Sequence, residues 1–468
     1  MELLDDSAKA VFAARRARLA ETMRAAGGGV AILPTAPERL RNGDSNHPYR
    51  ADSDFVHLTG FTEPESWLVV DATGRSTLVC RAKDPETEIW DGVRLGPEDA
   101  PGALGVDAAV PLDRLDEVLV ESLSDRPALW LPAASAELQA RLQGWLAGID
   151  TAANGFRRAP ASRHDLTPLL AEMRLVKDAH ELASLRRAAE ISAEAHGRVM
   201  RFCAERFRAD PAGSIAEHEI EAELLHAFRA AGAEGPAYGS VVAAGRNACT
   251  LHHVPGRTRL RAGELLLVDA GAEWDGYAAD ITRTFPATGR WSAEQRAVYG
   301  VVLAAQAAAV AATRPGARRL DAHAAAVRTL TEGLLDLGLL DRDRVGSVDD
   351  AVASAAYRRF YMHGTGHWLG RDVHDAGDTV ERGEAPFEQP DWKGGTVVKP
   401  PSRRLVPGMV TTIEPGLYVR PGEDVDPRWW WIGVRIEDDA VVTESGCELI
   451  SRGVPVEPDA IERLMRGG

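Results

Sequence analysis

The chain has 468 residues and a formal net charge of −16, with 70 acidic against 54 basic side chains. A chain of this length exceeds one ordinary hydrophobic core, so we expect two domains or one large elaborated domain. Its composition, with 45% hydrophobic and 26% charged residues, is typical of a soluble globular protein. The acidic balance argues against a nucleic-acid partner, which would require clustered Lys and Arg.

Cysteine usage and the N-terminus indicate the compartment. Four cysteines are scattered without a CxxC pair, which argues against a disulfide framework or a thiolate zinc site and suits a reducing interior. The N-terminus begins acidic, whereas a signal peptide needs a basic start and a continuous apolar run. The most Ala-rich stretch, 301–312, is too short and has flanks too polar to span a bilayer. We therefore expect a cytoplasmic protein with no membrane partner.

The first part of the chain predicts a smaller α/β domain. Short strand-like runs alternate with segments in which Leu recurs at i, i+3 and i+4 spacing, which predicts a mixed or parallel sheet covered by helices. A polar loop is expected at 41–55. The expected helices lie at about 8–26, 112–124 and 135–146, and the expected strands lie within 65–72 and 76–82.

A change of composition near 155–180 marks the domain boundary. A loop-like string, RRAPASRHDLTPLL, precedes one long helical segment. Asp178 is a suitable N-cap for this helix, and Glu181, three residues further on, would complete a capping box. We place the boundary just before this helix, which divides the chain into domains 1–172 and 173–468.

The second domain predicts an α+β arrangement. Helices are expected at about 178–206, 215–231, 293–313 and 320–338, with strand hairpins between them. Helices that are segregated against antiparallel hairpins make an α+β domain. The Gly- and Pro-rich stretch 380–404 predicts a long surface loop.

One predicted hairpin, at 263–286, carries two acidic residues. Its turn is Trp274-Asp275-Gly276, because Gly accepts the positive φ that a tight hairpin requires. This turn places Asp269 and Asp280 on facing strands, close enough to share a site.

Five metal-type ligands lie in apolar or Gly-rich strings of the second domain. They are Asp269, Asp280, His367, Glu414 and Glu437. A carboxylate carried into an apolar environment must be neutralised, paired or bound to a cation, because burying it bare is costly. Four carboxylates with a single imidazole suit two divalent ions such as Mn, Co or Fe(II). Two such ions can hold a bridging water, lower its pKa and polarise the bond under attack.

Each ligand taken alone has a simpler explanation. Asp269 and Asp280 could be turn or strand-end acids, and Glu437 in RIEDD could belong to a solvated charge run. A lone histidine is more often a core residue than a ligand. The string HGTGHWLGRDVH, however, holds three histidines among glycines, which are His363, His367 and His374. Taken together, these residues favour a metal site.

These strings resemble the metallopeptidases of family M24, the creatinase/methionine aminopeptidase superfamily, which have the pita-bread fold. The motifs VDAG, DITRTF, HGxxHxxG, xEPG and RIED occur in that order across about 170–455. The resemblance implies two divalent metal ions in a C-terminal pita-bread catalytic domain. Mn²⁺ is the expected ion, with Co²⁺, Fe²⁺ or Zn²⁺ as alternatives. The implied metal ligands are Asp269, Asp280, His367, Glu414 and Glu437, with Asp280 and Glu437 serving both ions.

The resemblance also implies catalytic roles. His363 and His374 match the histidines that contact the substrate and stabilise the tetrahedral intermediate. Glu414 is the implied general base and proton shuttle.

Further residues match substrate-binding positions of the family. His252 in TLHHVP matches the substrate-side histidine upstream of the first Asp, with its neighbour His253 as the second choice. Tyr418 and Arg435 match positions near the leaving group, and Arg435 is expected to orient Glu414 or a substrate carboxylate.

The N-terminal string RLRNGDSNHPYRADSDFVHLTGF, followed by TEIWDGVRLG, resembles the N-terminal domain of Xaa-Pro aminopeptidases (aminopeptidase P). In that family the Trp of the E-I-W string reaches the active site of a neighbouring subunit. Trp90 occupies this position, and the simpler alternative is a core aromatic. The resemblance implies a dinuclear metal-dependent aminopeptidase that cleaves the bond between an N-terminal residue and a following proline. Its partners would be peptides with proline at the second position and its own copies, in a homodimer or homotetramer.

Two alternative functions differ in class. A prolidase restricted to Xaa-Pro dipeptides is the nearest one, and a catalytically inactive pita-bread binding scaffold is the other. All five ligand positions hold ligand-type residues, which disfavours both the scaffold and metal-free hydrolysis of the creatinase type. The loop at about 376–405 looks longer than is usual in the family, which affects the expected shape of the substrate entrance.

Overall fold

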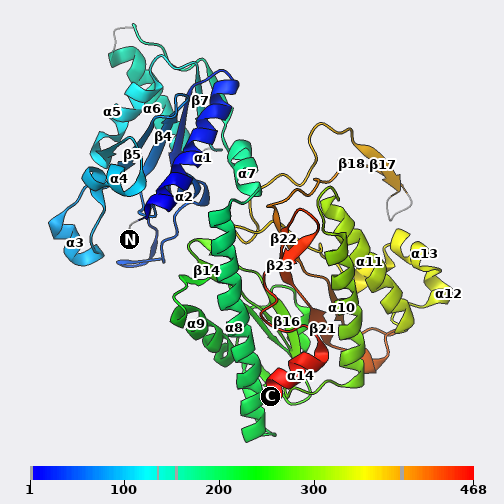
Figure 1. Cartoon of the computed structure of the whole chain (residues 1–468). Coiled ribbons are helices and arrows are strands. Elements are labelled where there is room, and N and C mark those ends of the chain that lie inside the picture. Colours follow the sequence, from blue (N-terminus) through cyan, green and yellow to red (C-terminus); the bar gives the residue numbers. More distant parts are fainter. Residues whose placement is uncertain (1–3, 134–135, 153–155, 391–394, 468) are drawn as a thin grey trace. The chain divides into compact units, whose positions relative to one another are not determined.

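The computed structural model describes residues 4–133, 136–152, 156–390 and 395–467 (Figure 1). The chain forms two compact units, Met1–Met173 and Arg174–Gly468. Each unit has its own hydrophobic core.

The N-terminal unit is built on a six-stranded mixed sheet of order β6-β5-β4-β1-β7-β8. This confirms the predicted sheet covered by helices. Its strands are β1 (Val30–Pro34), β4 (Trp67–Asp71), β5 (Ser76–Cys80), β6 (Ala108–Pro111), β7 (Ala128–Leu131) and β8 (Ser162–Asp165). Its helices are α1 (Asp6–Ala25), α2 (Ser53–Thr59), α3 (Pro85–Asp91), α4 (Gly96–Leu104), α5 (Leu115–Leu123), α6 (Ala136–Ala152) and α7 (Thr167–Leu175), of which α7 ends just beyond this unit.

Alternate residues of the central strands enter two different cores. Ala31 and Leu33 of β1 pack with residues of α1, α2 and α4, whereas Val30 and Ile32 pack with residues of α5 and α6. Because successive side chains of a strand point to opposite faces, the sheet is covered on both sides. Burial of both faces of the sheet therefore explains why β1 is apolar without interruption.

The predicted polar loop at 41–55 was wrong in part. It contains the ribbon of β2 (Leu40–Asn42) with β3 (Ser45–Asn46) and the start of α2. Asp52 begins α2 as an N-cap whose side chain accepts the Phe55 N–H at 3.0 Å. The short helices α3 and α4 were not predicted either.

The C-terminal unit has the predicted α+β arrangement, and every described strand pair in it is antiparallel. The four predicted helices are confirmed as α8 (Ala179–Ala209), α9 (Glu217–Ala230), α10 (Ala293–Ala312) and α11 (Arg319–Asp336), to which the structure adds α12 (Arg342–Val345), α13 (Val348–Ala353) and α14 (Pro458–Arg466). The capping box of α8 is confirmed as well, since Asp178 and Glu181 each accept the other's backbone N–H at 3.0 Å.

Short strands carry the ligand-bearing segments. The first group is β9 (Ser214–Ala216), β10 (Gly235–Pro236), β11 (Val241–Ala244), β12 (Arg259–Arg261), β13 (Leu265–Asp269), β14 (Ala272–Trp274), β15 (Tyr277–Ala278) and β16 (Thr282–Pro286). The second group is β17 (Phe387–Pro390), β18 (Thr396–Lys399), β19 (Val410–Ile413), β20 (Gly416–Val419), β21 (Ile432–Arg435), β22 (Asp438–Val442) and β23 (Cys447–Leu449).

The predicted hairpin at 263–286 forms with one difference. Strand β13 pairs with β16, and β14 pairs with β15 around a turn in which Asp275 and Gly276 have φ values of 54° and 68°. Asp269 ends β13, as expected. Asp280 does not lie on a strand but in the irregular segment 279–281 between β15 and β16. This break turns its side chain out of the regular ladder.

Helix α8 supports this hairpin from behind. The Ser192 hydroxyl accepts the Ala272 N–H at 2.8 Å, and His196 Nε2 donates to the Ala270 carbonyl at 2.9 Å. Between these contacts, a Cβ added to Gly271 would lie 1.7 Å from the Ala279 carbonyl oxygen. The two arms that carry Asp269 and Asp280 therefore approach so closely that only Gly fits.

Two expectations about the C-terminal unit need correction. Helix α10 is longer than the Ala-rich stretch alone, and by length and composition it could cross a membrane. It packs on α11 and β21 and buries Val298, Val302 and Ala305, as a core helix does. The predicted loop at 380–404 contains the antiparallel pair β17 and β18, and its residues 391–394 lie outside the described residues.

We expect Gly271→Ala to destabilise the protein by about 1–3 kcal/mol or more, because the added methyl group meets backbone that cannot move aside. The matched control is Gly300→Ala in α10, where an added Cβ meets nothing within 4 Å. It should stabilise the protein by up to about 1 kcal/mol. Denaturant unfolding of both variants measures the difference, and equal stabilities would contradict the close approach.

Candidate metal centre

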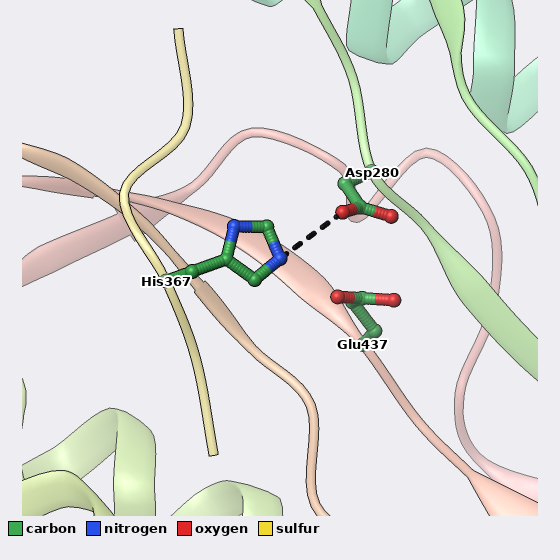
Figure 2. A group of neighbouring side chains, drawn as sticks. All are labelled: Asp280, His367 and Glu437. Atoms are coloured by element: carbon green, nitrogen blue, oxygen red, sulfur yellow. Dashed lines mark ion pairs between the residues drawn. The ribbon is translucent and has the colours of Figure 1, made fainter. Parts of the chain in front are cut away.

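Three of the predicted ligands meet at one point (Figure 2). Asp280, His367 and Glu437 each offer one ligand atom, and these atoms lie within 4.8 Å of one another. Asp280 lies just before β16, and Glu437 lies between β21 and β22. His367 lies in the irregular segment that precedes β17. His367 Nε2 is 3.3 Å from Asp280 Oδ2. Its Nδ1 donates to the Trp368 carbonyl at 3.0 Å, so Nε2 is the ring nitrogen that faces the acids.

The other two predicted ligands join the same site through neighbours. Tyr238 connects Asp269 to Asp280, because its hydroxyl lies 2.6 Å from Asp269 Oδ1 and 2.7 Å from Asp280 Oδ1. Glu414, between β19 and β20, has Oε1 3.8 Å from His367 Nε2. All five predicted ligands line one cavity of about 700 Å³.

The buried acids are poorly solvated without a cation. Burial raises the pKa of Glu437 well above its usual value, and the charges of Asp280 and Glu414 add to this effect. Burial likewise raises the pKa of Glu414 to about 7, although the charges of His367 and Arg435 oppose it. For His367, burial alone would lower the pKa, but the contact with Asp280 raises it to about 9. A donor set of carboxylates and one imidazole fits hard or borderline divalent cations, which would offset this repulsion.

A chain of donors orients the acids. Arg435 donates through Nη2 to Asp269 Oδ2, through Nη1 to the Tyr418 hydroxyl at 3.1 Å, and through Nε to Thr282 Oγ1 at 3.1 Å. Thr282 in turn donates to Glu437 Oε2 at 2.6 Å. Both Arg435 and Thr282 are buried. The structure therefore places Arg435 against Asp269, where it fixes a predicted ligand.

The two predicted catalytic histidines differ in their environments. His363 is fully engaged, since its Nδ1 donates to the Gly364 carbonyl at 2.7 Å and its Nε2 accepts the Tyr418 hydroxyl at 2.8 Å. Burial and the charge of Arg435 lower the pKa of His363 to about 4, so the ring is neutral. His374 lies against His367, with ring centroids 4.0 Å apart and ring planes tilted by 37°. Within the described residues, neither ring nitrogen of His374 has a hydrogen-bond partner.

The predicted substrate residues are distributed over both units. His252 is exposed and lines the cavity. His253 also lines it, but its Nε2 lies 2.9 Å from Oε2 of the buried Glu217, which anchors it to α9. Trp90 belongs to the N-terminal unit, on α3, where it is 86% exposed and therefore not a core aromatic.

Several residues of the site were not predicted from the sequence. Tyr238 follows β10 outside any motif, and Thr282 stands inside the DITRTF string without a predicted role. Asp438 and Asp439 are fully buried, which excludes the solvated charge run as an explanation of RIEDD. Asp438 pairs with Arg283 at 2.7 Å, and Asp439 Oδ2 accepts the Asp280 N–H at 3.2 Å.

Comparison with known proteins gives consistent matches for both units. Residues 183–444 match metallopeptidase family M24, and residues 12–130 match the aminopeptidase P N-terminal domain. The Xaa-Pro aminopeptidase of Escherichia coli (strain K12) is 39% identical to this chain, over 97% of each. The Xaa-Pro aminopeptidase of Haemophilus influenzae is 37% identical, over 98% of this chain and 97% of its own length. The solved structure of Pseudomonas aeruginosa aminopeptidase PepP has 43% sequence identity and a TM-score of 0.89, and covers 100% of this chain and 99% of that one.

We expect Tyr238→Phe to weaken metal binding about 10–100-fold, since two ligand carboxylates lose the hydroxyl that orients them. Burial raises the pKa of Tyr238 well above its usual value, so the wild-type hydroxyl remains a donor. Tyr299→Phe is the matched control, because the buried Tyr299 hydroxyl donates to the Val456 carbonyl at 2.6 Å and touches none of the ligands. Titration of the metal-free proteins with Mn²⁺ should separate the two variants; similar affinities would refute this role.

Metal binding should release protons. His367 has a raised pKa of about 9 in the metal-free protein and must lose its proton to become a ligand. As the pH increases toward that value, the apparent affinity for the metal should rise about tenfold per pH unit for each proton released. The contribution of His367 to this rise should stop at higher pH, where the ring is already neutral. Calorimetric titrations at about pH 7.5 in buffers of different ionisation enthalpy count the protons. An identical heat in all buffers would contradict the expectation.

Proposed function

The chain belongs to metallopeptidase family M24, and from this we propose that it hydrolyses the bond between an N-terminal residue and a following proline in peptides. It is a metal-dependent aminopeptidase with an aminopeptidase P N-terminal domain and a C-terminal pita-bread domain. The observation that carries the proposal is that all five ligand-type residues line one cavity in a chain that matches Xaa-Pro aminopeptidases over nearly its full length.

We propose that the centre takes two divalent ions, with Mn²⁺ as the expected ion and Co²⁺, Fe²⁺ or Zn²⁺ as alternatives. The four carboxylates carry the charge that two such ions neutralise. Asp280 and Glu437, at the middle of the ligand group, are suited to serve both ions. When bound, such ions lower the pKa of water and polarise the scissile carbonyl.

The proton shuttle is Glu414. General acid–base catalysis needs a proton acceptor within reach of the reacting atoms, and the Glu414 carboxylate lines the cavity with its Oε1 3.8 Å from His367 Nε2. Its Oε2 is 3.6 Å from His363 Nδ1, so the carboxylate lies beside a neutral ring that does not compete for the proton.

Of the two candidate histidines, His374 is the better oxyanion donor. Both nitrogens of His363 are already engaged, by Gly364 and Tyr418. His374 lines the cavity and has both nitrogens available within the described residues. We assign the substrate contact to His374 and a supporting role to His363, while His252 lines the exposed rim.

Proline recognition needs a site that does not depend on an amide N–H. An Xaa-Pro bond has no such donor, and the ring fixes φ near −65°. The cavity is lined by the apolar side chains of Val241, Leu251 and Val254 beside the polar centre. Such a wall suits a pyrrolidine ring.

The N-terminal unit completes the proposal. The exposed Trp90 on α3 suits contact with the active site of another copy, so we propose a homodimer or homotetramer. We assign residues 1–172 to the aminopeptidase-P-type domain and residues 173–468 to the catalytic domain, and we propose that the enzyme works in the cytoplasm.

The test is to strip the protein with a chelator, restore it with Mn²⁺ and follow cleavage of Arg-Pro-Pro-type peptides. We expect these peptides to be cleaved after the first residue, and Xaa-Pro dipeptides to be cleaved more slowly or not at all. The reverse preference would indicate a prolidase. If no Xaa-Pro peptide is cleaved with any of the four metals, the proposal is wrong.

Asp269→Ala should abolish both metal binding and turnover, because it removes a ligand and leaves Arg435 without its carboxylate. Asp459→Ala is the control: this exposed acid pairs with Arg296 on the surface and should leave both quantities unchanged. Elemental analysis and the peptide assay measure the two effects. A metal-loaded, active Asp269→Ala variant would remove this residue from the centre.

A further inference from the structure

The segment that carries His374 is held by a cluster of four charges, of which three are buried and Asp372 is 41% exposed. Asp375 Oδ2 lies 2.8 Å from Lys177 Nζ, and Asp375 Oδ1 accepts from Arg174 Nη2. Arg174 Nη2 also lies 2.6 Å from Asp372 Oδ2. The side chains of Lys177 and Asp375 are each 1% exposed, and that of Arg174 is 5% exposed. We call these four residues the charge clamp.

The charge clamp joins segments far apart in the sequence. Its cations stand at 174 and 177, at the beginning of the C-terminal unit, and its acids stand at 372 and 375. Burial alone would raise the pKa of Asp375, but the charges of Lys177 and Arg174 lower it below its usual value. Asp375 is therefore ionised and paired.

A cluster of buried charges contributes little to the overall stability of a fold. The desolvation penalty of buried charges offsets most of their attraction, and well-packed apolar residues often stabilise a fold as much. What paired charges provide is a defined geometry, because each hydrogen bond fixes direction as well as distance. The geometry fixed here is that of the turn 370–375.

That turn is wrapped tightly around the Asp375 carboxylate. The Asp375 N–H donates to the Trp368 carbonyl at 2.9 Å, and the Asp372 N–H donates to Asp375 Oδ1 at 3.3 Å. A Cβ added to Gly370 would lie 2.2 Å from Asp375 Oδ2. The backbone on both sides of His374 is thereby held to one carboxylate.

His374 depends on this backbone for its orientation. Its ring has no hydrogen bond of its own within the described residues, and it lies one residue from Asp375, about 3.8 Å along the chain. We propose that the charge clamp is a positioning device that holds His374 over the metal centre for the reaction. This inference rests on the proposed function, in which His374 contacts the substrate.

The test is a double-mutant cycle in the full-length, metal-loaded protein. Asp375→Asn keeps the shape of the side chain but removes its charge, and it should lower kcat on an Xaa-Pro-Pro peptide about tenfold or more while metal content stays unchanged. In a His374→Ala background the same change should cost less than about twofold, since the group it positions is gone. An equal factor in both backgrounds, or a loss of metal with Asp375→Asn, would overturn the proposal.

Two further variants guard against a trivial result. If Asp375→Asn fails to fold, Asp375→Asn combined with Lys177→Met removes both partners of one buried pair without leaving an unpaired charge, and the same cycle applies. Asp459→Asn changes an exposed carboxylate in the same way and should leave kcat unaltered. A loss of activity in this control equal to that of Asp375→Asn would also overturn the proposal.

An NMR measurement separates this inference from the proposed function. The ring signals of His374, identified by their absence in His374→Ala, should shift or broaden in Asp375→Asn. This readout needs no turnover, so it stands even if the wild type cleaves no Xaa-Pro peptide. Unchanged His374 signals in the folded variant would show that the charge clamp does not position the ring.

Discussion

Four carboxylates in one cavity repel one another, and the arrangement of the rest of the site depends on this repulsion. Asp269, Asp280 and Glu437 accept hydrogen bonds from donors that face them, which are the hydroxyls of Tyr238 and Thr282 and the guanidinium of Arg435. Glu414 lies beside the rings of His363 and His367 instead. These donors reduce the repulsion, but burial and the charges of the neighbouring acids still raise the pKa of Glu437 well above its usual value. A group of carboxylates of this kind favours divalent cations, and the donors set the directions in which the carboxylate oxygens point.

The four acids lie at the ends of strands or in the breaks between them. Asp269 ends β13, Asp280 lies in the break before β16, and Glu414 and Glu437 each separate two strands. A residue inside a ladder has a side chain fixed by the pleat, whereas a residue at a break can turn toward a common point. Pro415 follows Glu414 directly, and helix α8 supports the hairpin that carries Asp269 and Asp280 from behind.

Local chemistry in the sequence predicted those parts of the structure that local chemistry determines. The capping box of α8, the turn at Asp275 and Gly276, and the helices with regular apolar spacing were all foreseeable. That the five predicted ligands line one cavity was foreseeable, because each of them stands inside a recognisable string. Tyr238 was not, because it lies 31 residues from Asp269 in an unremarkable segment and joins the site only after β10 and β14 pair. Burial of Asp438 and Asp439 was hidden for the same reason, since a run of acids looks solvated until Arg283 is seen against it.

The charge clamp has a consequence for how the chain could be divided or recombined. Helix α8 begins with its own complete capping box at Asp178, so a catalytic fragment starting there would look self-contained and would keep every metal ligand. It would nevertheless lack both cations that neutralise Asp375, which come from the four residues just before it. If the charge clamp positions His374 as proposed, the last few residues of the connecting segment serve the catalytic domain, and a swap of N-terminal domains between relatives should keep its junction upstream of Arg174.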